Sequence, residues 1–106
     1  MKRAPRHLRP ETRRWWREVA RGYELEPHHT KLLTLACEAL DRGQEARELL
    51  AREGLTVTDR YGQLRGHPAA SIERQEAVTF ARLVRELGLD TESPPEARPP
   101  RIGGGR

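Results

Sequence analysis

Residues 31–50 have the sequence KLLTLACEALDRGQEARELL, in which apolar residues recur every three or four positions. This spacing is typical of an amphipathic α-helix, and it predicts a long helix over about residues 27–53, ended by Gly54. The middle of the apolar stripe consists of small residues, which would let another helix approach closely, either within the chain or in a second subunit. We assign the stripe to an oligomer interface that comprises Leu32, Ala36, Ala39, Gly43, Ala46 and Leu50.

The segment before this helix carries two adjacent tryptophans among arginines, RRWWREVAR at residues 13–21. Pro10 suits the first turn of a helix and Gly22 suits its end, so we expect a helix over about residues 10–22. A helical wheel places Trp15 and Trp16 on the apolar face, and it places three arginines on the opposite face: Arg14, Arg17 and Arg21. The tryptophans therefore have two possible roles, which are packing in the core and stacking on nucleic-acid bases.

The segment after the long helix predicts a hairpin and a third helix. In LTVTDRYGQLRGHP, two short β-capable runs flank the turn sequence DRYG, which predicts a β-hairpin over about residues 55–66. A third amphipathic helix is expected over about residues 69–88. The predicted fold is mainly α, with three helices and a short β-hairpin between helices 2 and 3, in a domain of residues 10–90. A basic, flexible arm (1–9) precedes this domain, and a disordered tail rich in Pro and Gly (91–106) follows it.

The charge of the chain is unevenly distributed. The net charge is +4, yet residues 1–23 alone hold eight Lys or Arg and two Glu. A local basic patch of this kind favours a polyanionic partner. Charged residues make up 34% of the chain, against about 25% in typical domains. The core is therefore small, and the chain gains stability from burying a face against copies of itself or against a partner.

Residues that could carry chemistry are sparse. Cys37 is the single cysteine, no Cys/His cluster has zinc-ligand spacing, and no glycine-rich phosphate loop is present. We therefore expect no catalysis, no cofactor and no metal. The sequence also lacks an apolar run long enough for a membrane span and the apolar region of a signal peptide. We accordingly expect a cytoplasmic protein without a membrane partner.

With these elements in place, the sequence resembles the small terminase subunits of bacteriophages, the regulatory part of a DNA-packaging motor. The fragments that carry the resemblance span roughly residues 8–90: YELEP, LACEALDR, EGLTVTDRYGQ, HPAA followed by ERQEA, and FARLVRELGL. The resemblance implies a non-enzymatic homo-oligomer, assembled as a ring in the host cytoplasm. It also implies two partners, which are double-stranded viral DNA and a large terminase subunit whose ATPase and nuclease are regulated.

The candidate DNA-binding residues are the cations of the arm and of the first helix, which would neutralise phosphates. They are Lys2, Arg3, Arg6, Arg9, Arg13, Arg14, Arg17 and Arg21. Two other functions remain open, namely a helical adaptor that binds a protein and a dimeric DNA-binding transcription regulator. Retention on heparin or duplex DNA separates the adaptor from the DNA-binding proteins, and the native mass separates a dimer from a ring.

Overall fold

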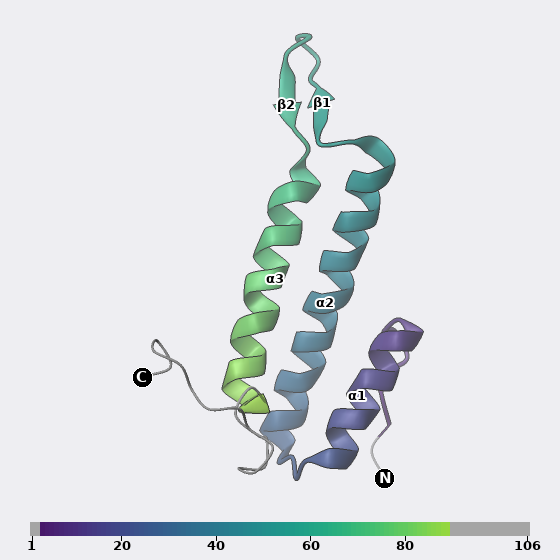
Figure 1. The fold of residues 1–106 in the computed structure, drawn as a ribbon, viewed down its shortest axis with the longest axis vertical. Helices are drawn as coiled ribbons and strands as arrows, with labels where there is room; N and C mark the ends of the chain where they lie inside the picture. Colours follow the sequence, from purple (N-terminus) through teal and green to yellow (C-terminus); the bar gives the residue numbers. More distant parts are fainter. Residues whose placement is uncertain (1–2, 90–106) are drawn as a thin grey trace, which may run out of the picture.

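The structure is a computed structural model, and it describes residues 3–89. Its elements are α1 (Pro10–Gly22), α2 (Pro27–Glu53), β1 (Thr56–Thr58), β2 (Leu64–Gly66) and α3 (Pro68–Leu87). The helices α2 and α3 run antiparallel side by side, the β-hairpin projects from one end of this pair, and α1 lies against α2 near the other end (Figure 1). The expected fold class, three helices with a hairpin between the second and the third, is confirmed. The tail expected at residues 91–106 lies outside the described residues.

One glycine and one histidine fix the end of α2 and the start of α3, at the base of the hairpin. Gly54 ends α2 with a φ of +89°, a left-handed conformation that glycine adopts without strain. His67 caps α3, because its Nδ1 accepts a hydrogen bond of 3.0 Å from the backbone N–H of Ala69. The proton of its ring therefore lies on Nε2, which donates to Oε1 of Glu53 at 2.8 Å. The end of α2 and the start of α3 are thus joined at the base of the hairpin.

The two strands form an antiparallel ladder in which Thr56 is opposite Gly66 and Thr58 is opposite Leu64. The turn between them is held by Asp59, whose Oδ1 accepts hydrogen bonds from the backbone N–H groups of Tyr61 at 2.8 Å and Gln63 at 2.9 Å. This is the local role for which a turn-initiating Asp is favoured. The DRYG sequence therefore closes the hairpin as expected.

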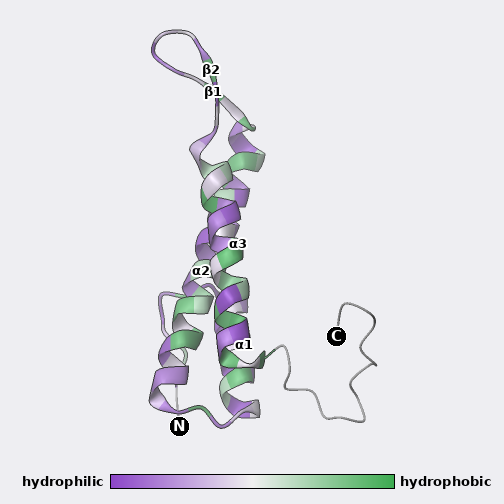
Figure 2. Cartoon of the chain, turned by 90° about the vertical axis from the view of Figure 1, so that its left-hand side faces the viewer, coloured by the Kyte–Doolittle hydropathy of each residue, from purple (hydrophilic) through white to green (hydrophobic). Residues whose placement is uncertain are grey.

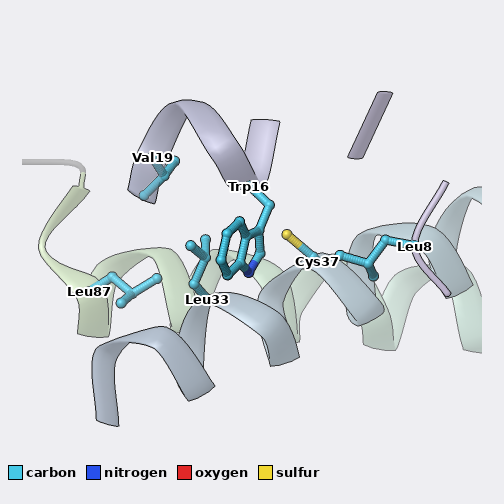
Figure 3. Packing of buried hydrophobic residues seen from close by; sticks show 6 residues of the cluster. All are labelled: Leu8, Trp16, Val19, Leu33, Cys37 and Leu87. Atoms are coloured by element: carbon cyan, nitrogen blue, oxygen red, sulfur yellow. The ribbon is translucent and has the colours of Figure 1, made fainter. Parts of the chain in front are cut away.

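The core lies where α1 packs across α2 and the last turn of α3. It is a cluster of six buried residues: Leu8, Trp16, Val19, Leu33, Cys37 and Leu87. Figure 3 shows the indole of Trp16 between the side chains of Leu33 and Cys37. Burial raises the pKa of the Cys37 thiol to about 12, so the thiol stays protonated and serves as a small apolar side chain. This cluster fixes the orientation of α1 on the helical pair.

The small-residue stripe of α2 faces α3 of the same chain. Hydrophilic and hydrophobic bands alternate along both helices, as expected for amphipathic helices (Figure 2). Ala36, Ala39 and Ala46 are buried within the single chain, and a Cβ placed on Gly43 would lie 3.5 Å from the Cβ of Glu76 in α3. Gly43 therefore faces α3 within the chain. The interface role of the six residues remains a prediction.

Candidate nucleic-acid interface

The start of α1 is docked on α2 by one carboxylate. Pro10 occupies the first helical turn, where its missing N–H costs nothing. Arg9 precedes it at the N-cap and supplies no side-chain cap. Instead, Asp41 of α2 accepts hydrogen bonds from the backbone N–H of Arg9 at 2.9 Å and from Oγ1 of Thr12 at 2.5 Å. Asp41 therefore accepts from the N-cap N–H, the group that a Glu or Gln at N3 would satisfy in a capping box, and it joins the start of α1 to α2.

Arg9 is paired with Glu48 of α2. Its two terminal nitrogens donate to the two oxygens of the Glu48 carboxylate, each at 2.9 Å. These hydrogen bonds lower the pKa of Glu48 from 4.5 to about 2 and raise the pKa of Arg9. In this bidentate pair, the Glu48 carboxylate already accepts from both terminal nitrogens of the Arg9 guanidinium. This geometry gives Arg9 a structural role on α2, and its contact with DNA remains a prediction.

The end of the arm nearest α1 is packed against the helices. Leu8 is 2% exposed and belongs to the core cluster. Arg13 reaches back from α1 and donates to the carbonyl oxygens of Leu8 at 2.7 Å and Arg6 at 3.2 Å. The arm expected to be flexible is therefore anchored at its last residues. The side chains of Arg3 and Arg6 are exposed, and Lys2 lies outside the described residues.

The outward face of α1 carries the stripe Arg14, Arg17 and Arg21, which we call the α1 arginine stripe. All three side chains are exposed. Within residues 3–89, no ion pair or side-chain hydrogen bond engages any of them. They span about 10 Å along the helix at a rise of about 1.5 Å per residue. One strand of duplex DNA presents about three phosphates over that length of its axis.

The like charges of the stripe repel one another, and Glu18, which lies four residues after Arg14 and three before Arg21, offsets part of this repulsion. The members of the stripe lie three and four residues apart, so their like charges are neighbours on the helix surface. Each such pair costs about 0.2–0.5 kcal/mol in an isolated helix. A phosphate near the stripe would relieve this repulsion, and the docked helix would present all three guanidinium groups on one rigid surface. The arrangement therefore suits binding of a polyanion.

The two tryptophans face inward and do not accompany the stripe. Trp16 is 2% exposed, and its Nε1–H donates to Oγ1 of Thr34 at 3.2 Å. Trp15 is half-buried, with its ring tilted against Phe80 of α3 at a centroid distance of 5.7 Å. Of the two roles that the sequence left open for them, the structure selects core packing. Base stacking would require these rings to leave their contacts.

Sequence reasoning missed the ion pairs that connect different helices. A spacing of four residues would place Glu38 beside Arg42 and Glu48 beside Arg52 on the surface of α2. In the structure, these acids instead contact His7 and Arg9 of the arm at 2.8 and 2.9 Å. Arg42 pairs with Glu76 of α3 at 3.2 Å, and Arg47 pairs with Glu73 at 2.8 Å. Arginines held in these pairs differ from the α1 arginine stripe, which is free to accept an external anion.

Other kinds of site find little support in the described part of the chain. Residues 3–89 contain no group of three or more His, Cys, Asp or Glu side chains placed to hold a metal ion. His29 has a structural role at the start of α2, where its Nδ1 accepts a hydrogen bond of 3.2 Å from the backbone N–H of Glu26. No helix within the same range has the length and apolar character needed to cross a membrane. The α1 arginine stripe remains the strongest candidate site.

Comparison with known proteins identifies a family. The family model described as phage terminase, small subunit, matches residues 11–99. Neither the curated proteins nor the solved structures give a significant match to the chain. The matched range includes the α1 arginine stripe, both strands and all of α2 and α3.

Proposed function

Because the chain belongs to the phage terminase small-subunit family, we propose that it is a DNA-binding homo-oligomer that recognises viral DNA and regulates the large terminase subunit during genome packaging. It acts without catalytic activity of its own, in the cytoplasm of the host. The observation that carries the DNA-binding part is the exposed α1 arginine stripe, which has no ion-pair partner in the described chain. The family membership supports the assignment to packaging.

In this proposal, Arg14, Arg17 and Arg21 neutralise phosphates and release condensed counterions. Phosphate contacts position a protein on the duplex but carry no sequence information directly. The stripe therefore supplies affinity, and selection of a viral site depends on contacts beyond these three side chains. Assembly of several copies would repeat the stripe, so a weak patch would bind one DNA molecule at several points with much higher avidity.

The cations of the arm divide into two groups in this proposal. Arg9 and Arg13 hold the arm to α1 and α2 through Glu48 and backbone carbonyls. Arg3 and Arg6 are exposed and would extend the basic surface beyond the stripe, together with Lys2. The DNA-contacting set proposed here is accordingly smaller than the full list of cations in residues 1–21.

A matched pair of triple variants tests the DNA interface. One variant changes Arg14, Arg17 and Arg21 to Ala, and the control changes the three exposed arginines of α3, Arg74, Arg82 and Arg85, to Ala. Both variants lose three positive charges, so a general effect of net charge would weaken duplex binding by the same amount in the two variants. We expect the α1 variant to lose most of its affinity for duplex DNA at near-physiological salt while the α3 variant keeps it. Equal losses, or none, would contradict the proposed interface.

Regulation of the large subunit calls for a separate assay, because it concerns a different partner. The segment SPPEARPPR, residues 93–101, lies outside the described residues, and we propose it as a contact for the large subunit. The chain truncated after Asp90 should then stimulate the ATPase of the large subunit less than the full chain does. Undiminished stimulation by the truncated chain would place that contact elsewhere.

A further inference from the structure

The last described residues lead the chain toward α1. Gly88 ends α3 in the left-handed conformation, with a φ of +78°. Leu87 belongs to the core cluster together with Val19 of α1, and Leu89 packs against the same cluster, as does Ala20. Figure 3 shows Leu87 and Val19 at the same end of this cluster. The chain therefore leaves α3 on the side where α1 is docked.

The sequence that follows separates its negative charges from its positive charges. Residues 90–96, DTESPPE, contain three carboxylates and no Lys or Arg, and we call them the acidic tail segment. Residues 97–106, ARPPRIGGGR, contain three arginines and no Asp or Glu. Both stretches lie outside the described residues. The part of the tail that is nearest to α3 along the chain thus has a formal charge of −3.

The acidic tail segment is long enough to reach the α1 arginine stripe. Glu92 and Glu96 follow Leu89 by three and seven residues. An extended chain spans at most about 3.6 Å per residue, so their Cα atoms can lie up to about 11 and 25 Å from that of Leu89. Helix α1 is about 10–12 Å across with its side chains. The path around α1 from Ala20, on the core side, to the stripe is therefore within reach of Glu96.

The α1 arginine stripe suits carboxylates as well as phosphates. Its three side chains are exposed, and within residues 3–89 none of them is held in an ion pair. A guanidinium can bind a carboxylate with two parallel hydrogen bonds, as Arg9 binds Glu48 in this chain. A single exposed ion pair is weak. A short tether, however, holds the segment near the stripe at an effective concentration of the order of millimolar, so no strong individual contact is needed.

Two exposed arginines of α3, Arg82 and Arg85, are nearer to the acidic tail segment along the sequence. Two features favour the stripe on α1. It presents three arginines between residues 14 and 21, and the packing of Leu89 against the core cluster directs the chain toward α1. The α3 arginines are therefore the alternative that an experiment must exclude.

We propose that the acidic tail segment of the same chain occupies the α1 arginine stripe when DNA is absent and competes with duplex phosphates for it. This inference rests on the proposed function, because it concerns the regulation of the DNA-binding site named there. An occupied stripe is closed to phosphates, so the apparent affinity for duplex DNA falls with the fraction of stripes that are open. A duplex carries many closely spaced phosphates and displaces the segment where several stripes bind together.

The same competition connects the two partners of the proposed function. The acidic tail segment overlaps residues 93–101, the contact proposed above for the large subunit. A large subunit bound there withdraws Glu96 from the stripe and raises the affinity of the chain for duplex DNA. By thermodynamic linkage, duplex DNA raises the affinity for the large subunit by the same factor. The chain thereby binds its two partners cooperatively.

Carbodiimide cross-linking of the full-length chain tests the contact without DNA. The reagent joins a carboxylate to a nearby primary amine, and Arg21→Lys supplies such an amine in the stripe while keeping its charge. Arg85→Lys is the matched control on α3. We expect cross-links from position 21 to Glu92 or Glu96, several-fold more abundant than those from position 85, and we expect added duplex DNA to diminish them. Cross-links mainly from position 85 would overturn the inference.

A mixture of isotope-labelled and unlabelled chains shows whether the segment belongs to the same chain. Each cross-linked pair of peptides should then be either fully labelled or fully unlabelled. Cross-linked pairs that join one labelled and one unlabelled peptide would place the segment on a neighbouring copy and overturn the inference as stated.

Duplex affinity tests the competition. One variant carries Glu92→Gln with Glu96→Gln, and the control carries Glu45→Gln with Glu86→Gln at exposed positions of α2 and α3. Both variants lose two negative charges, so a general effect of net charge is the same in the two. At low salt, we expect the tail variant to bind duplex DNA about three- to tenfold more tightly than the control does. Equal affinities of the two variants would contradict the competition.

The two readouts distinguish failure of this inference from failure of the proposed function. Loss of duplex binding on removal of the α1 arginine stripe, with no cross-link from position 21, would overturn the inference and leave the DNA interface intact. A cross-link that duplex DNA does not diminish, with duplex binding that survives removal of the stripe, would overturn both the competition and the proposed interface.

Discussion

The guanidinium of Arg9 donates two hydrogen bonds of 2.9 Å to the carboxylate of Glu48, which lies 39 residues further along the chain. This pair joins the residue before α1 to the outward side of α2. Together with Asp41, which accepts hydrogen bonds from Arg9 and Thr12, it holds α1 in one orientation. The α1 arginine stripe is consequently presented to solvent by a docked helix.

The Arg9–Glu48 pair predicts an acid-sensitive contribution to stability. The pKa of Glu48 is lowered from 4.5 to about 2 in the folded chain, so its contribution is complete above about pH 4.5 and disappears as the pH falls toward 2. Urea unfolding from pH 6 to pH 2 should show a deficit for Glu48→Gln that is largest near pH 6 and shrinks on acidification. Glu86→Gln, at an exposed position of α3, is the control. A Glu48→Gln deficit that is independent of pH would contradict this role.

The burial of Trp16 predicts a large loss of stability when its side chain is removed. Trp16→Ala should lower the free energy of unfolding by about 3–5 kcal/mol, because it empties the centre of a small core and leaves Thr34 without its indole donor. Trp15→Ala should cost less, since Trp15 is half-buried against Phe80. Chemical denaturation measures both. If Trp15→Ala leaves the fold intact yet weakens duplex binding, base stacking by that ring is favoured and our interpretation is wrong.

The packing around Gly43 predicts that replacing it with Ala stabilises the fold. A Cβ at this position would meet the Cβ of Glu76 at 3.5 Å, an ordinary van der Waals distance. Gly43→Ala should therefore raise the free energy of unfolding by about 1 kcal/mol through helix propensity alone. Gly43→Leu should lower it by about 1–3 kcal/mol, because the larger side chain would press α2 away from α3. Destabilisation by Gly43→Ala would show that the helices approach more closely than described.

Much of the fold follows from local signals in the sequence. Pro10, Pro27, Gly54 and Gly88 mark helix starts and ends through the absence of an N–H or through tolerance of a positive φ. The apolar period predicts which face of each helix is buried, and it placed Trp16 correctly in the core. These signals act within a few residues, which is why a single sequence reveals them.

Local signals in the sequence do not determine which element packs against each helix face. The small stripe of α2 suits any closely packed helix, and only the fold shows that α3 of the same chain covers Gly43. The pairing of Arg42 with Glu76 likewise depends on how α3 is rotated against α2. For the candidate site, the wheel predicted that Arg14, Arg17 and Arg21 share a face, but not that Arg9 is paired with Glu48. A signal for the anchored arm was Leu8, an isolated apolar residue among cations.

The salt dependence of duplex binding tests the central claim, that the α1 arginine stripe contacts DNA phosphates, most directly. The slope of log affinity against log salt concentration changes by about 0.9 for each phosphate contact that is lost. Changing Arg14, Arg17 and Arg21 to Ala should therefore flatten the slope by up to about 2.7 per chain bound. The slope for the Arg74, Arg82 and Arg85 control should match the wild type. A slope unchanged by the α1 substitutions would contradict the claim and remove these residues from the DNA interface.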